Sequence, residues 1–260
     1  MKKLIFYLSV FGLLVLCFKT RAQDVVAIGV RGGISIPNLS GGGSSEQNPL
    51  NTGYSSRTGP DAALFAEFKF SDLFSIQPMV EYSSEGGKKD GFQALPTPAA
   101  IDAAYQAQGA TAPTYLYANY KSEAKFNYLM VPILAKFGWN FAEKSPWRVY
   151  VDAGPFVGFL LNAHQVTSGT SNFYADAAGK EELPYGEQNL NNNQNIKSDL
   201  HSTNFGIEGN IGFAYNLKSS YVFVEGGGNY GFLNIQKGTA NGKNNIGAGT
   251  AAIGYAYWFK

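Results

Sequence analysis

The most constraining feature of this 260-residue sequence is a repeated alternation of apolar and polar residues with a period of two. In residues 205–216, the clearest example, the odd positions are apolar or Gly and the even positions are Gly, Glu, Asn and Ala. Successive side chains of a β-strand point to opposite faces, so each such segment predicts a strand with one apolar and one polar face. After residue 22 there is no run of 18 apolar residues, which excludes a transmembrane helix there.

The alternation recurs in eight segments, and the connections between them are alternately short and long. The segments are residues 26–36, 61–70, 74–84, 122–139, 147–161, 204–216, 221–232 and 245–259. The short connections are 71–73, 140–146 and 217–220, and the long polar ones are 37–60, 85–121, 162–203 and 233–244. Tight periplasmic turns and long extracellular loops are typical of outer-membrane barrels. We therefore predict an all-β fold, an eight-stranded antiparallel up-and-down transmembrane β-barrel with both termini on the short-turn side.

A soluble β-sandwich also has alternating strands, and the aromatic residues distinguish the two folds. Two groups of aromatic side chains fall at opposite ends of the apolar faces, as bilayer interfaces favour. Those near the short turns are Phe70, Phe74, Phe137, Trp139, Tyr215, Tyr257 and Phe259, and those near the long loops are Tyr82, Phe159, Phe205, Tyr230 and Phe232. The barrel is therefore favoured. Pro78, Pro132 and Pro155 fall inside predicted strands, where we expect a bulge or a lost ladder bond.

The N-terminus has the pattern of a secretory signal peptide. Lys2 and Lys3 precede an apolar run over residues 4–18, and small residues stand at Thr20 and Ala22. We predict a signal peptide over residues 1–22 and one barrel domain over 23–260. A retained membrane anchor is an alternative, but the run is short for a bilayer span. A lipoprotein site at Cys17 is another, but Leu16 is too bulky for the position before it.

Cleavage after Ala22 removes four basic residues and the single Cys, which leaves 16 basic and 19 acidic residues. The exported chain is then free of disulfides and has a net charge of −3. Without a basic excess we expect no nucleic-acid partner. With two His in the whole chain we expect no metal site and no cofactor.

The polar face of the predicted strands carries a set of charged residues. Strand parity places four basic and five acidic side chains on the inner face: Arg31, Glu67, Lys69, Glu81, Lys136, Arg148, Asp152, Glu208 and Glu225. Buried unpaired charges cost several kcal/mol each, so these groups must pair or hold water. The interior of an eight-stranded barrel is just wide enough for side chains. We predict a cross-barrel ion-pair network that closes the lumen.

Three stretches give a resemblance to a known family. Residues 29–40, the Tyr128-Leu129-Met130-Val131-Pro132 strand and the ending over residues 251–260 resemble the PorT-like outer-membrane β-barrel family. The resemblance covers essentially the whole exported chain and implies an architecture like the small OmpA- and OmpX-like barrels. It also implies a family whose members are mostly of unknown function, with some linked to protein secretion across the outer membrane. One departure is Lys260, which follows the aromatic Phe259 that usually ends such a chain.

Three functional hypotheses remain open. The first is a non-enzymatic barrel in the lipid of a Gram-negative outer membrane, monomeric by default, that acts structurally or through contacts of its loops with envelope or secretion proteins. The second is a small conduit or ligand-holding barrel. The third is an enzyme on the outer surface, since residues 201–206 are similar to a stretch of outer-membrane lipid A deacylases. Thr203 stands where those enzymes have Ser, and parity points Glu225 inward, away from His201, so we expect no enzyme. His164 could approach His201 across the loop.

Two features of the long loops can also be read. Residues 97–109 predict a short helix with Thr97 as N-cap, Pro98 in its first turn and Gly109 after its end. Residues 189–195 are rich in Asn and are expected to be mobile.

Overall fold

The computed structural model describes residues 25–41, 49–50, 52–238 and 242–259. The signal peptide predicted for residues 1–22 lies outside this part of the chain. Among the described residues, no helix is long and apolar enough to cross a membrane.

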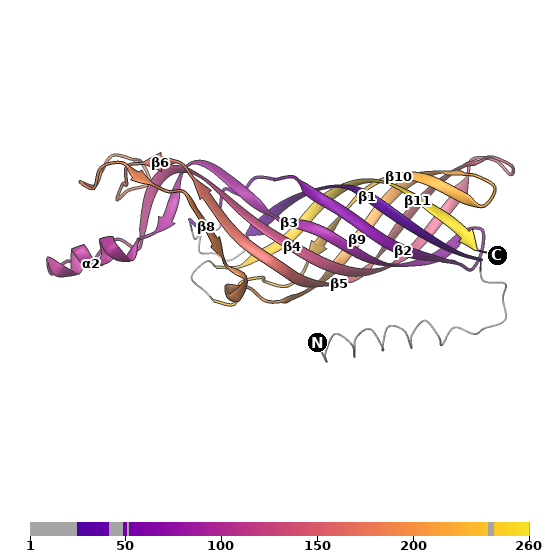
Figure 1. Ribbon diagram of the computed structural model, residues 1–260, viewed down its shortest axis with the longest axis horizontal. Coiled ribbons are helices and arrows are strands. Elements are labelled where there is room, and N and C mark those ends of the chain that lie inside the picture. The colour runs from indigo at the N-terminus through magenta and orange to yellow at the C-terminus, as the bar shows by residue number, and fades with distance from the viewer. Residues whose placement is uncertain (1–24, 42–48, 51, 239–241, 260) are drawn as a thin grey trace.

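Eight long antiparallel strands form a closed ring (Figure 1). They are β1 Val25–Gly41, β2 Gly59–Lys69, β3 Phe74–Pro96, β4 Tyr115–Asn140, β5 Trp147–Ser168, β9 Thr203–Asn216, β10 Ser220–Gly231 and β11 Asn244–Phe259. Each strand pairs with its neighbours along the chain, and β1 pairs with β11 to close the barrel. All eight predicted strands are present, and the closed ring excludes the sandwich, so the predicted fold is confirmed.

The barrel wall continues far beyond the length that a bilayer requires. Strands β3, β4 and β5 contain 23, 26 and 22 residues, whereas a tilted strand crosses a bilayer in about 9–11. Residues 85–96 and 115–121, which we predicted as loop, therefore form a paired hairpin. The prediction failed because this hairpin is no longer lipid-facing: exposed positions such as Lys88 and Asp90 are polar, so the apolar alternation is lost.

Smaller elements complete this end of the molecule, which lies opposite the C-terminus in Figure 1. Helix α2 spans Ala99–Ala107, β6 Thr170–Ser171 pairs with β7 Gln188–Asn189, and η1 spans Lys197–Asp199. Strand β8 Asn192–Asn195 pairs with β5, so much of the segment that we expected to be mobile is part of a sheet. We call residues 85–121 and 162–203 the extension. It has its own core of Ile101, Leu116, Ala118, Phe173 and Leu183.

The predicted cap of α2 is wrong. Pro98 occupies the N-cap position and no side chain caps the helix. The Thr97 hydroxyl instead donates a hydrogen bond to the Pro113 carbonyl across the base of the loop. Gly109 does follow the helix, with a φ of +69° that favours glycine.

The outward face of the ring is apolar and aromatic, as predicted. Exposed aromatic side chains lie at both ends of this face, among them Phe70, Trp139 and Phe259 near the short turns and Phe159 and Phe205 near the long loops. Two interfacial belts around an aliphatic band are what a bilayer selects, so the belts are confirmed.

The three prolines coincide with gaps in the ladders. Pairing of β3 with β4 stops after Pro78 and resumes at Glu81 in the same register, and that of β4 with β5 stops after Pro132 and resumes at Ala135. Pro155 lies opposite this second gap. Because the register is unchanged, the prolines remove ladder bonds and do not create bulges.

Candidate functional site

The structure buries seven of the nine charged residues assigned to the interior. They are Arg31, Glu67, Glu81, Lys136, Asp152, Glu208 and Glu225. Lys69 and Arg148 lie outside this set, at the barrel mouth next to the short turns. Lys69 forms an ion pair with Asp72 at 2.7 Å, and Arg148 donates from Nη2 to the Asp72 carbonyl at 2.8 Å. Their positions at the strand ends let them reach solvent.

Arg31 is the centre of the first buried cluster. Its Nη1 lies 2.6 Å from Glu225 Oε1, and its Nη2 lies 2.7 Å from Glu81 Oε2 and 3.1 Å from Glu208 Oε1. Asp61 Oδ1 is a fourth acidic neighbour at 3.7 Å. These residues come from β1, β10, β3, β9 and β2, so one guanidinium ties together strands from around the ring.

Lys136 is the centre of a second cluster, nearer the short turns. Its Nζ lies 3.2 Å from Glu67 Oε2 and donates to Gln77 Oε1 at 3.0 Å. It also lies over the Tyr150 ring, 4.1 Å from the centroid, which is a cation–π contact. The Tyr221 hydroxyl donates to the same Glu67 oxygen. The ammonium ion is thus held by a carboxylate, an amide and an aromatic face.

Polar side chains link the clusters. Tyr150 Oη donates to Glu225 Oε2 at 2.6 Å, and Asn210 Nδ2 donates to Asp152 at 2.9 Å and to Glu208 at 3.2 Å. Gly212 makes room for Tyr150, because a Cβ atom there would lie 2.2 Å from the Tyr150 Cζ. The interior therefore contains one connected polar network.

This network has more carboxyl groups than cations. Arg31 and Lys136 face the carboxyl groups of Asp61, Glu67, Glu81, Asp152, Glu208 and Glu225. Within the described residues, Asp61, Glu81, Asp152 and Glu208 have buried oxygens that lack a hydrogen-bond partner. Buried charges without partners are costly, so the network must hold protons or water in addition to its ion pairs.

The inner face contains polar residues that our prediction did not include. Asp61, Gln77 and Asn210 belong to the network, as do the hydroxyls of Tyr150 and Tyr221. Their signal was present in the sequence, since they share the parity of Glu67, Glu81, Glu208, Asp152 and Glu225 respectively.

Apolar layers lie on both sides of the Arg31 cluster. One layer, which includes Phe126, Tyr128, Met130 and Phe156, fills the barrel toward the extension. The other includes Phe65, Tyr150 and Phe223 and surrounds Lys136. Side chains therefore fill the middle of the lumen from both directions.

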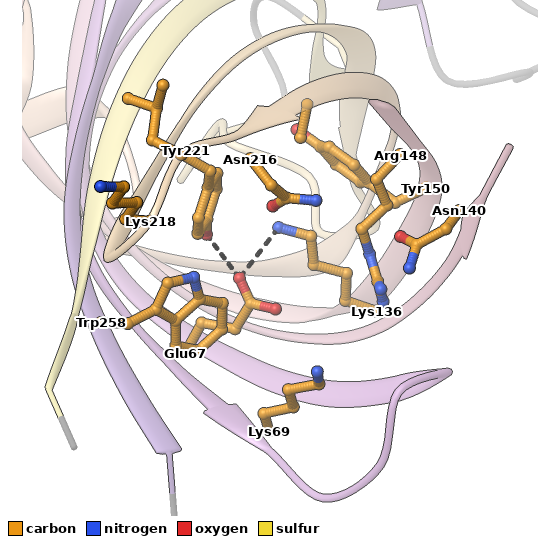
Figure 2. A pocket seen from close by; sticks show the side chains of 12 residues that line it. Glu67, Lys69, Lys136, Asn140, Arg148, Tyr150, Asn216, Lys218, Tyr221 and Trp258 are labelled. Carbon is orange, nitrogen blue, oxygen red and sulfur yellow. Dashed lines mark hydrogen bonds and ion pairs between the residues drawn. The ribbon is translucent and has the colours of Figure 1, made fainter. Parts of the chain in front are cut away.

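A cavity lies at each end of this filled zone, and the two share no lining residue. The cavity at the short-turn end, which we call the cup, has a volume of about 280 Å³ and is lined by residues that include Lys69, Arg148, Lys218 and Trp258 (Figure 2). The cavity at the other end, which we call the vestibule, has a volume of about 620 Å³. Its lining includes Tyr54, Lys89, Tyr120, Gln165 and Gln194.

Charged groups near both cavities have shifted pKa values. The hydrogen bond and charge of Lys69 lower the pKa of Asp72, beside the cup. Burial lowers the pKa of Lys89 to about 8. The Lys89 Nζ donates to the carbonyls of Pro49 and Leu50 and lies 4.5 Å from the centroid of the Tyr54 ring.

The residues considered for enzymatic chemistry do not form a site. His201 and Thr203 are exposed, whereas Glu225 is buried inside the barrel with Arg31 and Tyr150. A nucleophile needs a base within hydrogen-bond reach and a group to orient it, and the wall separates these residues. His164 Nδ1 lies 2.9 Å from Asn193 Oδ1. In the described ranges, no group of three or more His, Cys, Asp or Glu residues could hold a metal ion.

The match to one protein family agrees with this architecture. A family model described as outer membrane protein beta-barrel domain matches residues 21–237. No curated protein sequence matches the chain. Among solved structures, Neisserial surface protein A is similar at 14% identity with a TM-score of 0.41, and the match covers 90% of this chain and 99% of that one.

Two further solved structures are similar over most of their length. OprG from Pseudomonas aeruginosa has 12% identity and a TM-score of 0.36, with 91% of this chain and 97% of that chain covered. The outer membrane protease OmpT from Escherichia coli has 10% identity and a TM-score of 0.35, with 93% and 99% covered.

Proposed function

Because the chain belongs to the outer membrane protein beta-barrel domain family, and so lies in a Gram-negative outer membrane, we propose that it acts there without enzymatic chemistry, through contacts of its extension. The observation that carries this proposal is the hairpin of β3 and β4, which continues as a paired sheet past the aromatic belt. A barrel that served only as an anchor would need no such length.

The extension has the properties of a surface for partner contacts. Its own core holds it as a folded unit, with Ile101 of α2 and Phe173 buried. Ala103 and Ala107 on the other side of α2 are exposed at the far tip of the molecule. Loops fixed on a rigid scaffold are the usual place for binding residues. The partner that we propose is an envelope or secretion protein, in keeping with the resemblance to the PorT-like family.

The filled lumen supports a role other than conduction. The Arg31 and Lys136 clusters and the flanking apolar layers occupy the section that an ion would have to cross. In planar bilayers, the purified exported chain should therefore show no steady conductance. A stable open channel would contradict this part of the proposal.

Site-specific photo-crosslinking in living cells tests the contact role. A crosslinker at Ala103 should give a discrete, reproducible adduct with an envelope protein. The matched control is a crosslinker at Ala142, which is exposed in the β4–β5 turn at the opposite end of the barrel and does not line the short-turn cavity. Absence of adducts from Ala103 and from other exposed positions of the extension would overturn the proposal.

A second candidate function is supported by the vestibule. Its volume of about 620 Å³ is within the range of small-molecule sites, and its lining combines aromatic rings with amide side chains. In this case the barrel would hold a ligand at its outer end. Retention of a small molecule by the natively purified protein, lost in a Tyr120→Ala variant, would favour this function over contacts with proteins.

A further inference from the structure

The cup at the short-turn end carries a strong excess of positive charge. Four basic residues line it, Lys69, Lys136, Arg148 and Lys218, against one acidic residue, Glu67. Figure 2 shows these side chains arranged around the barrel opening, with Lys136 and Glu67 joined by an ion pair. Lys136 and Glu67 are the buried members of the set. Since the short turns of outer-membrane barrels lie on the periplasmic side, the cup opens to the periplasm.

Two of the four cations already have an acidic partner. Lys136 is paired with Glu67, whose oxygens also accept bonds from Ser75 and Tyr221. Lys69 is paired with Asp72. In the described part of the chain, Arg148 and Lys218 form no ion pair, so their two positive charges are not balanced within the cup.

The barrel wall fixes the position of the Arg148 side chain through Gly138 and Asp72. A Cβ atom at Gly138 of β4 would lie 2.3 Å from Arg148 Nε, so glycine at this position lets the guanidinium lie across the neighbouring strand. One of its nitrogens, Nη2, is held by the Asp72 carbonyl at 2.8 Å. The amides of Asn140 and Asn216 line the same opening and can add neutral donors.

We propose that the cup is a binding site for one oxyanion, a carboxylate or phosphate group presented from the periplasm. The planar fork of an arginine matches such groups, and an ammonium ion beside it adds charge. A volume of about 280 Å³ admits a small anionic group rather than a large ligand. The group has two possible sources, free phosphate or an acidic side chain of a periplasmic polypeptide.

Trp258 offers a direct optical test. It lines the cup and packs against Tyr221, whereas Trp139 and Trp147 are exposed on the outer face, and the sequence has three Trp in all. In a Trp139→Phe/Trp147→Phe background, fluorescence therefore reports on the cup. The exported chain in zwitterionic micelles is titrated with the anionic quencher iodide and with the neutral quencher acrylamide. Iodide quenching depends on the local charge and on access to Trp258, whereas acrylamide quenching depends on access alone. The ratio of the two quenching constants therefore reports the local charge.

The proposal predicts how variants change this ratio. Arg148→Gln/Lys218→Gln should lower the iodide quenching constant relative to that of acrylamide by about two- to fivefold. The change is modest because partly exposed charges attract an anion only weakly. Lys144→Gln is the matched control, since Lys144 is exposed in a short turn but does not line the cup. If the double variant fails to fold, Lys218→Gln alone can be tested. Its side chain is exposed and forms no hydrogen bond or ion pair within the described residues, so its replacement should not affect folding. An unchanged ratio in these variants would overturn the proposal.

Competition identifies the chemistry and its source. At matched ionic strength, sodium phosphate or a hexaglutamate peptide should reduce iodide quenching more than sodium chloride does, and hexaglutamine should have no effect. Suppression by phosphate alone supports free phosphate as the ligand, and suppression by hexaglutamate supports an acidic polypeptide. Equal suppression by chloride would show no oxyanion preference and would refute the site.

Discussion

Replacement of Arg31 by Met should destabilise the barrel strongly. The Arg31 side chain is 1% exposed, and its guanidinium has three hydrogen-bonded carboxylates within 3.1 Å and a fourth at 3.7 Å. Removal of one partner of a buried ion pair costs about 3–5 kcal/mol, because the other charge remains buried without compensation. Four carboxyl groups depend on Arg31, so we expect the upper part of this range. Total stabilities are about 5–15 kcal/mol, so the loss should be easy to measure.

The assay is equilibrium unfolding in urea of residues 23–260 in phosphatidylcholine vesicles, followed by the heat-dependent shift of the folded barrel on gels. Lys121→Met is the matched control. Lys121 is 70% exposed and lies 3.5 Å from Asp90, and exposed pairs of this kind contribute about 0–1 kcal/mol.

A double-mutant cycle separates charge from packing. Glu81 bonds to Arg31, so Arg31→Met/Glu81→Gln should be more stable than Arg31→Met alone, because one uncompensated carboxylate is removed. If Arg31→Met loses less than about 1 kcal/mol, like Lys121→Met, then Arg31 does not compensate the carboxyl groups and our account of the network is wrong.

Three other perturbations test separate parts of the structure. Gly212→Ala should cost about 1–3 kcal/mol in the same urea assay, because its Cβ would lie 2.2 Å from the Tyr150 Cζ, whereas Gly32→Ala, with nothing within 4 Å, should change little; equal effects would contradict the packing argument. Burial lowers the pKa of Lys89 to about 8, and the unfolded chain keeps this proton up to about pH 10.4, so stability should rise between these pH values. Lys89→Met should lack this rise, and the same rise in that variant would assign it to another group. Epitope insertion after Gln108, which is exposed beyond α2, should leave a folded, surface-accessible protein, whereas insertion after Lys89, inside the paired hairpin, should not. Surface labelling of cells and gel mobility check this, and a folded, accessible protein from both insertions would show that the hairpin behaves as a loop.

The sequence by itself determined the strands, their number and their outward face. In each membrane-crossing segment, one face must be apolar toward lipid and the other must fit the barrel interior. Both requirements therefore appear in the sequence of the segment itself, as alternation with a period of two. The same parity assigned Arg31, Glu81, Glu208 and Glu225 to the inside. Where the wall leaves the bilayer, the outward face no longer has to be apolar, and so the sequence pattern predicts a loop over residues 85–96 and 115–121 where the structure has a paired hairpin.

Only the tertiary structure decided which inward residues meet. Parity gives the face of a residue but not its height along the barrel axis, so Lys69 and Arg148 were placed in the network although they lie at its mouth. Nor does it give the partner, since Arg31 and Glu225 are 194 positions apart and meet because the closed ring brings β1 and β10 to one level. The cup has the same origin, because its lining comes from six strands and one turn whose ends are brought together by closure of the barrel.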